Sequence, residues 1–221
     1  FTATQLWDDW RESLEIGYRA AADRLREEGL TSSRRLTDFG ERNGPPRFSP
    51  DGQSLYIYHA SEESPAAIWS VDVDTAERRR VTVTPGRTVL APSTDGRFLY
   101  YSRGDRHQII YQYRDIFRYD LRTNQEERLT DGSRAFAVDV SPDGRSTVYS
   151  AFDADSSHLW IADADGENPR RLVESEYNEQ IYSPRFDPEG RRVAFSRWRN
   201  GGYRDIQIID IEDGSIRELT N

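Results

Sequence analysis

The chain has 221 residues, of which 35% are apolar and 12% aromatic, and no run of about 18 apolar residues, so it is neither a disordered segment nor a membrane-spanning protein. Its formal net charge of −9 argues against a surface that binds nucleic acid. It contains no cysteine, which excludes disulfides, cysteine nucleophiles and thiolate metal sites and fits an oxidising compartment such as the periplasm.

Residues 4–28 have the pattern of an amphipathic helix, because apolar side chains recur every three or four positions. Thr2 and Gln5 are placed to form a capping box at its start, and Gly29 is suited to end it. A lone helix is only marginally stable in water, so we expect its apolar stripe to be buried, either on the rest of this chain or in a partner protein. We assign residues 1–30 to this helical segment. The partner-binding candidates on it are Trp7, Trp10, Leu14 and Tyr18.

A short turn motif occurs four times in the remaining chain. Its clearest copy is Ser141-Pro-Asp-Gly144, in which proline presets φ, aspartate can bond to the backbone two residues on, and glycine accepts a positive φ. The acidic residue before the glycine lies at positions 51, 95, 143 and 189, which are 44, 48 and 46 residues apart. Repetition at this period is typical of a β-propeller, in which each repeat is one blade of four antiparallel strands.

Each repeat also contains an apolar strand that ends in aspartate, such as Ile68-Trp-Ser-Val-Asp72, and then a closing strand, such as Arg79-Arg-Val-Thr82. The sequence therefore predicts an all-β fold of four four-stranded propeller blades, preceded by the N-terminal helix. We assign residues 31–221 to the propeller. The predicted blades lie at about residues 45–84, 85–132, 133–175 and 176–221.

The segment Arg34-Arg-Leu-Thr37 matches a closing strand but has no blade before it. Blade four already has its own closing strand, so a strand at 34–37 would be a fifth one there. We therefore expect residues 31–37 not to pair with blade four, and the four blades to be part of a larger or incomplete ring whose open side is covered. The sequence begins at Phe1 and has no methionine, which also leads us to expect a processed piece of a longer product.

These motifs resemble the TolB-like, WD40-type propeller repeat, and the resemblance covers about residues 34–221. The clearest match is Pro46-Arg-Phe-Ser-Pro-Asp-Gly52, followed by the apolar strand and the closing strand of the same blade. The resemblance implies a bacterial envelope protein, usually of six or more blades, that binds other proteins. Similar repeats follow a zinc-peptidase-like domain in large envelope proteins, and others form the gating propeller of the prolyl oligopeptidase family. Fold alone does not choose among these functions.

Motifs that would indicate catalysis or a cofactor are missing from the sequence. It has no His-Glu-x-x-His pair, no Gly-x-Ser-x-Gly elbow and no phosphate-binding glycine-rich loop. His59, His107 and His158 fall in three different blades. The stretches that begin at Asp153 and Asp163 resemble calcium loops in part, but neither continues to a glutamate at the twelfth position. We expect no catalytic residues, no cofactor and no metal in this chain.

Two stretches rich in tyrosine, tryptophan and arginine are candidates for contact with a partner, because these residues are common interface anchors. The first is an insertion at residues 103–114 that we interpret as the longest variable loop of blade two, and the second is the equivalent loop of blade four. Ordinary loop packing is the alternative for both. The candidates are Arg106, Tyr111, Tyr113, Arg114, Trp198 and Tyr203.

The sequence therefore predicts a non-enzymatic, protein-binding scaffold of the bacterial envelope. In one version it is an accessory subunit of a larger membrane-bound complex. The alternative is the propeller of a longer peptidase, zinc-peptidase-like or prolyl oligopeptidase-like, whose catalytic domain lies outside this chain. A propeller that binds a small ligand or a sugar is a third possibility.

Overall fold

The computed structural model describes residues 2–29, 32–38, 42–86, 88–108 and 110–220. The chain divides into two compact units, Phe1–Arg35 and Leu36–Asn221, and each is described by itself.

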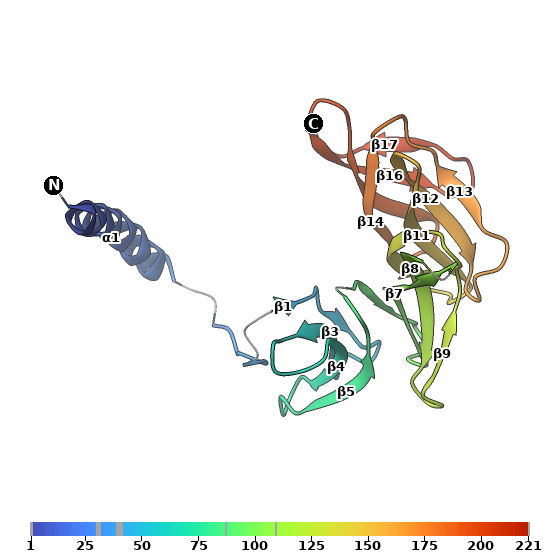
Figure 1. The fold of residues 1–221 in the computed structure, drawn as a ribbon, viewed down its shortest axis with the longest axis horizontal. Helices are drawn as coiled ribbons and strands as arrows, with labels where there is room; N and C mark the ends of the chain where they lie inside the picture. Colours follow the sequence, from blue (N-terminus) through green and yellow to red (C-terminus); the bar gives the residue numbers. More distant parts are fainter. Residues whose placement is uncertain (1, 30–31, 39–41, 87, 109, 221) are drawn as a thin grey trace. The chain divides into compact units, whose positions relative to one another are not determined.

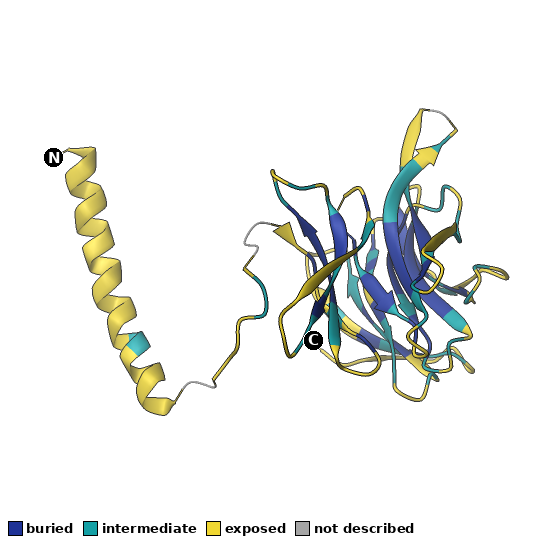
Figure 2. Ribbon diagram, turned by 90° about the horizontal axis from the view of Figure 1, so that it is seen from below, coloured by how far each residue is buried: buried dark blue, intermediate teal, exposed yellow. Residues whose placement is uncertain are grey.

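The first unit consists of one helix, α1 (Ala3–Glu28) (Figure 1). The predicted capping box is present: the Thr2 hydroxyl accepts the Gln5 N–H at 3.2 Å, and the Gln5 side chain accepts the Thr2 N–H at 2.9 Å. No residue of α1 is buried, and Trp7 and Trp10 expose 56% and 51% of their surface (Figure 2). The helix is confirmed, whereas the expected burial of its apolar stripe is not seen in this chain. Within the described residues, no helix is long and apolar enough to cross a membrane.

The second unit consists of four antiparallel sheets that follow one another along the chain (Figure 1). Blade one contains β1 (Arg42–Asn43), β2 (Arg47–Phe48), β3 (Ser54–Ala60), β4 (Ala67–Asp72) and β5 (Arg78–Val83). Blade two contains β6 (Leu90–Pro92), β7 (Phe98–His107), β8 (Tyr111–Asp120) and β9 (Gln125–Arg128). Blade three contains β10 (Ala135–Val140), β11 (Ser146–Asp153), β12 (Ser156–Asp163) and β13 (Arg170–Val173). Blade four contains β14 (Gln180–Phe186), β15 (Arg192–Trp198), β16 (Arg204–Asp210) and β17 (Ile216–Glu218). The predicted all-β fold of four propeller blades after one helix is confirmed.

The repeated turn joins the first two strands of each blade by the chemistry that its residues predict. In blade three, the Ser141 hydroxyl donates to the Asp143 carboxylate at 2.6 Å and accepts the Ser146 N–H at 2.9 Å. The hydroxyl of Ser141 is also the main reason that the pKa of Asp143 lies below its ordinary value. In blade four Asp187 replaces the serine, and its carboxylate accepts the N–H of Arg192, five residues ahead, at 3.0 Å. The turn therefore tolerates either side chain, because both supply an acceptor at the same place.

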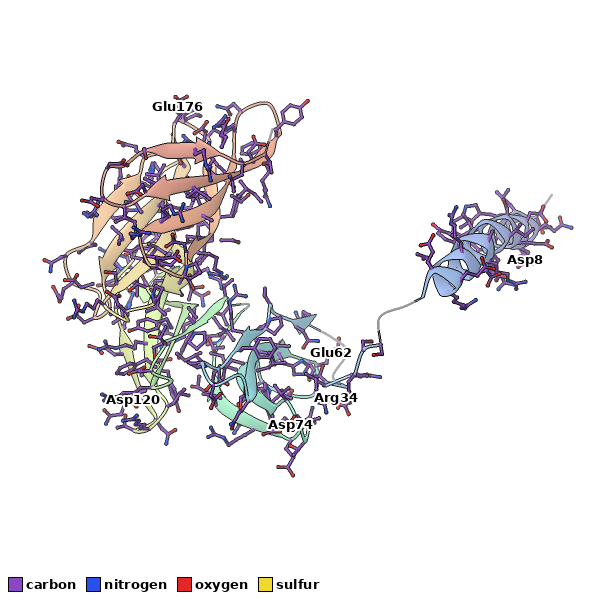
Figure 3. All side chains as sticks on the ribbon, turned by 180° about the vertical axis from the view of Figure 1, so that it is seen from behind. Asp8, Arg34, Glu62, Asp74, Asp120 and Glu176 are labelled. Atoms are coloured by element: carbon purple, nitrogen blue, oxygen red, sulfur yellow. The ribbon has the colours of Figure 1, made fainter. Side chains whose placement is uncertain are left out.

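The aspartate at the end of each third strand closes the next turn. The Asp120 carboxylate, labelled in Figure 3, accepts the backbone N–H groups of Arg122 and Thr123 at 2.8 and 3.2 Å. It also forms an ion pair with Arg97 at 2.8 Å. Asp72 accepts two backbone N–H groups of its own turn in the same way. The recurring aspartate is therefore a turn residue whose carboxylate accepts hydrogen bonds from local donors.

Three apolar clusters join neighbouring blades. Blades one and two share a cluster that includes Tyr56, Ile68, Leu99 and Phe117. Blades two and three share one that includes Tyr100, Ile116, Val138 and Tyr149. Blades three and four share one that includes Val148, Leu159, Ile181 and Phe195. Among the described strands, those of blade four contact blade three and not blade one, so the four blades form an open arc (Figure 1).

The segment predicted as an orphan closing strand has a different position. Residues 32–38 are in neither a helix nor a strand, so the strand predicted at 34–37 is wrong. Leu36 and Thr37 are half-buried, and the carboxylate of Asp38 lies 3.6 Å from the guanidinium of Arg78 in β5. An exposed ion pair therefore links Asp38 to blade one. Among the described strands, β17 pairs with β16 alone.

Candidate functional site

Among the described strands, the longest hairpin belongs to blade two. Strands β7 and β8 pair over ten positions, from Phe98 opposite Asp120 to His107 opposite Tyr111. The variable loop expected at 103–114 is therefore wrong, because residues 103–107 and 111–114 prolong the two strands. Tyr111 and Tyr113 alternate with polar residues at the period of a strand, and tyrosine favours that conformation. In strand β7, residues 103–106 are charged apart from Gly104, so they show no alternation of apolar and polar side chains.

The two faces of this hairpin differ in chemistry, because opposite residues share a face and neighbours alternate. His107, Tyr111 and Tyr113 lie on one face, which we name the aromatic face. The rings of Tyr111 and Tyr113 stack 5.7 Å apart, and His107 lies 5.3 Å from Tyr113. Arg106 and Arg114 lie on the opposite face. The structure thus brings together two of the predicted contact residues of this blade and separates them from the other two.

Arg114 is half-buried, and its burial lowers the pKa of the guanidinium from the ordinary value. Its Nε has no hydrogen-bond partner in the described part of the chain. Arg106 is exposed. Neither residue contributes to the aromatic face.

Arg134, at the start of blade three, continues the aromatic face. Its guanidinium lies 4.7 Å from the centre of the Tyr113 ring and donates to the Tyr113 hydroxyl at 3.2 Å. The Arg134 backbone has a φ of +54°, which is uncommon for a residue other than glycine. Tyr113 is thus in contact with Tyr111 and with Arg134. Nothing in the local sequence of Arg134 indicates this contact, because the two residues come from different blades.

The loop that presents Arg134 is fixed by a buried carboxylate. Asp115 is fully buried and accepts the Thr130 hydroxyl at 2.8 Å, the Arg128 guanidinium at 2.6 Å and the Gly132 and Ser133 N–H groups at 3.0 and 2.9 Å. A buried charge that is paired and fully hydrogen-bonded holds its partners in a defined geometry. Asp115 therefore fixes the connection between blades two and three.

Gly132 in the same loop is required by close packing. Its φ is +70°, and a Cβ at this position would lie 2.6 Å from the imidazole of His107. The imidazole Nδ1 is in turn 3.2 Å from the carboxylate of Asp131. Gly132 and Asp131 of this loop therefore pack against His107 of the aromatic face.

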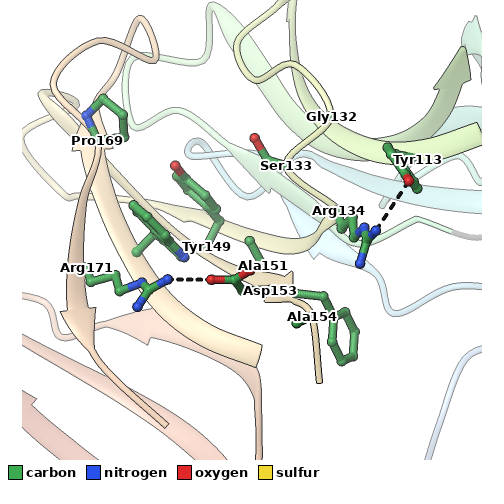
Figure 4. Close-up of a pocket in the computed structure, with 12 residues that line it drawn as sticks. Tyr113, Gly132, Ser133, Arg134, Tyr149, Ala151, Asp153, Ala154, Pro169 and Arg171 are labelled. Atoms are coloured by element: carbon green, nitrogen blue, oxygen red, sulfur yellow. Dashed lines mark hydrogen bonds and ion pairs between the residues drawn. The ribbon is translucent and has the colours of Figure 1, made fainter. Parts of the chain in front are cut away.

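A groove of about 710 Å³ lies where this loop approaches blade three (Figure 4). Its volume is within the range of ligand pockets. The residues that line it are Tyr113, Gly132, Ser133, Arg134, Tyr149, Ala151, Phe152, Asp153, Ala154, Trp160, Pro169 and Arg171. We name it the blade 2–3 groove. One of the predicted contact residues, Tyr113, lines it, and Trp160, Arg134 and Arg171 are additions that sequence reasoning missed.

The wall formed by blade three combines aromatic and charged side chains. The guanidinium of Arg171 lies 5.3 Å from the ring centre of Trp160 and forms ion pairs with Asp153 at 2.7 Å and Glu174 at 2.8 Å. Burial raises the pKa of the Tyr149 phenol to about 12, so this hydroxyl is protonated at neutral pH. The groove thus offers flat apolar surface with a few fixed polar groups, as ligand sites do.

The other predicted contact residues lie elsewhere. Trp198 ends strand β15, half-buried, so its expected position in a loop is wrong; it pairs with Gln180 on one side and Arg204 on the other. Tyr203 lies in the following turn with 78% of its surface exposed. Both belong to blade four, away from the blade 2–3 groove. The helix candidates Trp7, Trp10, Leu14 and Tyr18 are exposed in the other unit.

The three histidines each have a local role. His59 is 3.0 Å from the side chain of Asn43, and His158 accepts the N–H of Ser175 at 3.0 Å. In the described residues, no three histidine, aspartate or glutamate side chains gather as metal ligands would. The side chain of Asp163 accepts a hydrogen bond from Asn168 at 2.7 Å, in a turn between strands.

A family model described as the TolB beta propeller domain matches residues 27–182. An uncharacterized protein of Agrobacterium fabrum is 27% identical over 185 residues, which are 80% of this chain and 61% of that protein. The Tol-Pal system protein TolB of Xylella fastidiosa is 41% identical over 63 residues, which are 28% of this chain and 13% of that protein.

Two solved structures show how widely the fold is used. TolB from Acinetobacter baumannii matches with a TM-score of 0.69 and 21% identity, over 81% of this chain and 43% of that one. A prolyl endopeptidase matches with a TM-score of 0.59 and 16% identity, over 81% of this chain and 29% of that one. The chain thus spans less than two thirds of the length of these relatives. The family match covers more than half of the chain, and its strands and turns agree with it: the chain belongs to the TolB beta propeller domain family.

Proposed function

We propose that this chain is a non-enzymatic, protein-binding propeller of the bacterial envelope, and that the aromatic face together with the blade 2–3 groove is its contact surface. The observation that carries the proposal is the stack of Tyr111, Tyr113 and Arg134, which leads into a groove lined by Trp160. Tyrosine, tryptophan and arginine are the residues that most often dominate the binding energy of protein interfaces.

The surface is also rigid, which favours binding. Tyr113 is held in a ten-residue strand, and the loop that carries Arg134 is fixed by the buried carboxylate of Asp115. Side chains that are ordered before binding lose less conformational entropy when a partner docks. Contacts within the propeller therefore hold the stack in place before a partner arrives.

The proposed location of the chain is the periplasm. A relative of this chain is named as a Tol-Pal system protein, and the absence of cysteine fits an oxidising compartment. There it would contact other proteins, and in the more specific version of the proposal it is an accessory subunit of a membrane-bound complex. The alternative, the propeller of a longer peptidase, is supported by the prolyl endopeptidase match at the level of fold alone.

Capture of partners from native membranes tests the proposal. The chain should be tagged, expressed in its own host and purified after mild cross-linking, and the co-purified proteins identified by mass spectrometry. Tyr111→Ala should deplete the partner at least tenfold, because a large stacked anchor is lost. Tyr177→Ala, which removes a tyrosine that is 75% exposed in the connection between blades three and four, should leave capture unchanged.

Equal capture by both variants would refute the contact surface. A peptidase domain in the same encoded polypeptide, with cleavage that depends on the propeller, would instead support the alternative function.

A further inference from the structure

The two arginines that line the blade 2–3 groove differ in their ion pairing. Three charged side chains line it: Arg134, Asp153 and Arg171. Arg171 is neutralised by its ion pairs with Asp153 and Glu174, at 2.7 and 2.8 Å. Arg134 has no carboxylate partner within the described part of the chain (Figure 4). In a protein whose net charge is −9, Arg134 thus keeps a guanidinium that no described carboxylate contacts.

The guanidinium of Arg134 is held ready for a ligand. It stacks on the Tyr113 ring at 4.7 Å and donates one hydrogen bond to the Tyr113 hydroxyl at 3.2 Å. A guanidinium has five N–H donors, so most of them stay available, and their fork matches the two oxygens of a carboxylate. Because the side chain is already ordered, binding a carboxylate here loses little rotamer entropy.

Part of the blade three wall of the groove is apolar. Tyr149 and Ala151 are buried in blade three, and Trp160 and Pro169 lie beside them. When a ligand carboxylate binds Arg134, the ligand atoms next to that carboxylate would contact this wall. The groove therefore fits one negative charge attached to an apolar body.

We infer that the blade 2–3 groove binds a carboxylate of a partner polypeptide, either an aspartate or glutamate side chain or a free C-terminus, with an apolar residue next to it. This inference rests on the proposed function, since it names the chemistry of the partner. A polypeptide is favoured over an acidic sugar because sugars stack on open ring faces, whereas here Tyr113 is covered by Tyr111 and Arg134, and Trp160 lies under Arg171.

The test uses the full 221-residue chain labelled with ¹⁵N and three peptide probes. The first is acetyl-Pro-Leu-Asp-Ala-amide, the second is its Asn twin, and the third is acetyl-Pro-Leu-Asn-Ala with a free C-terminal carboxylate. The Asp probe should shift the amide signals of residues 132–134 and 151–154, and the Asn twin should not. The third probe shows whether a terminal carboxylate serves better than a side chain.

Two variants test whether Arg134 provides the positive charge that binds the carboxylate probes. Arg134→Gln should weaken binding of the carboxylate probes roughly tenfold, the usual effect of losing a charge-assisted bond. Arg106→Gln is the matched control, because Arg106 lies on the opposite face of the blade two hairpin, and it should bind within about twofold of the parent.

Three results would overturn the inference: equal shifts with the Asp probe and its Asn twin, full binding by Arg134→Gln, or no shift with any carboxylate probe at the highest soluble concentration. Stronger binding of galacturonic acid than of all peptides would assign the groove to an acidic sugar and overturn it as well. Partner capture separates this inference from the proposed function. If Tyr111→Ala loses the partner and Arg134→Gln keeps it, the contact surface stands and the carboxylate inference fails.

Discussion

Replacement of Asp139 by asparagine should change how the stability of the propeller depends on pH. Asp139 lies in β10 and joins blades three and four: its carboxylate accepts the Phe186 N–H at 2.9 Å and lies 3.7 Å from the guanidinium of Arg185. Burial is the main cause that raises the pKa of Asp139 from 3.8 to about 6. The hydrogen bond from the Phe186 N–H and the charge of Arg47 oppose this rise in pKa.

The sign of the effect follows from the raised pKa. The folded protein binds this proton more tightly than the unfolded chain does, so the contribution is fully present below pH 3.8 and is lost as the pH rises through about 6. A rise of about two pKa units corresponds to about 3 kcal/mol of unfolding free energy. The amide that replaces the carboxyl group cannot ionise, yet its oxygen can still accept the Phe186 N–H. Relative to the parent, Asp139→Asn should therefore gain up to about 3 kcal/mol of stability between pH 4 and pH 8.

Urea unfolding followed by tryptophan fluorescence, at one-unit steps from pH 4 to pH 8, measures this difference. Comparing the two proteins at each pH cancels the effect of the other carboxylates, whose lowered pKa values act in the opposite direction. These carboxylates are Asp51, Asp95, Asp120, Asp143, Asp187, Asp213 and Glu218. A difference that stays constant with pH would refute the role of burial. A difference that favours the parent at high pH would show that Arg185 outweighs it.

Gly132→Ala should lower the melting temperature by the equivalent of about 1–3 kcal/mol, because of its steric clash and positive φ, whereas Gly52→Ala, with a similar φ and open space, should lose less. Asp115→Ala should cost about 3–5 kcal/mol in urea unfolding, since it removes the buried partner of Arg128 and leaves two loop N–H groups without an acceptor, and the exposed Asp131→Ala should cost less than about 1 kcal/mol; equal effects would refute the role of the buried carboxylate. Trp10→Ala should shift calorimetric stability by less than about 0.5 kcal/mol because half of the side chain is exposed, and a loss above about 1 kcal/mol, measured in the same scan, would show that the helix is packed in the folded protein.

The fold could be predicted because each blade repeats a turn that forms through contacts between residues close in the sequence. Ser141, Asp143 and Gly144 form a turn by contacts within five residues, so their spacing reveals the repeat without knowledge of the rest. The strand expected at 34–37 failed for the opposite reason. Its residues match a closing strand, but residues 32–38 do not form one, because strand formation depends on neighbours that are distant in the sequence.

The site could be predicted only in part. Tyr111 and Tyr113 were identifiable as an unusual aromatic pair, although their strand was expected to be a loop. Arg134 and Trp160 gave no such signal, because they join the site through contacts between blades. Which face of a blade meets its neighbour depends on strand register, and a single sequence does not reveal it.

The open arc determines where the propeller resists distortion. Among the described strands, each blade packs only on the blades beside it, so the total stability is close to a sum of blade terms and three joints. Among the described strands, blades one and four are each held by one joint, while blades two and three are held by two. In these 221 residues taken alone, fraying and mechanical pull should therefore separate the outer blades first. The joint between blades two and three, where the groove lies, would be the last to open. A partner bound in the groove would therefore stay bound while the outer blades separate.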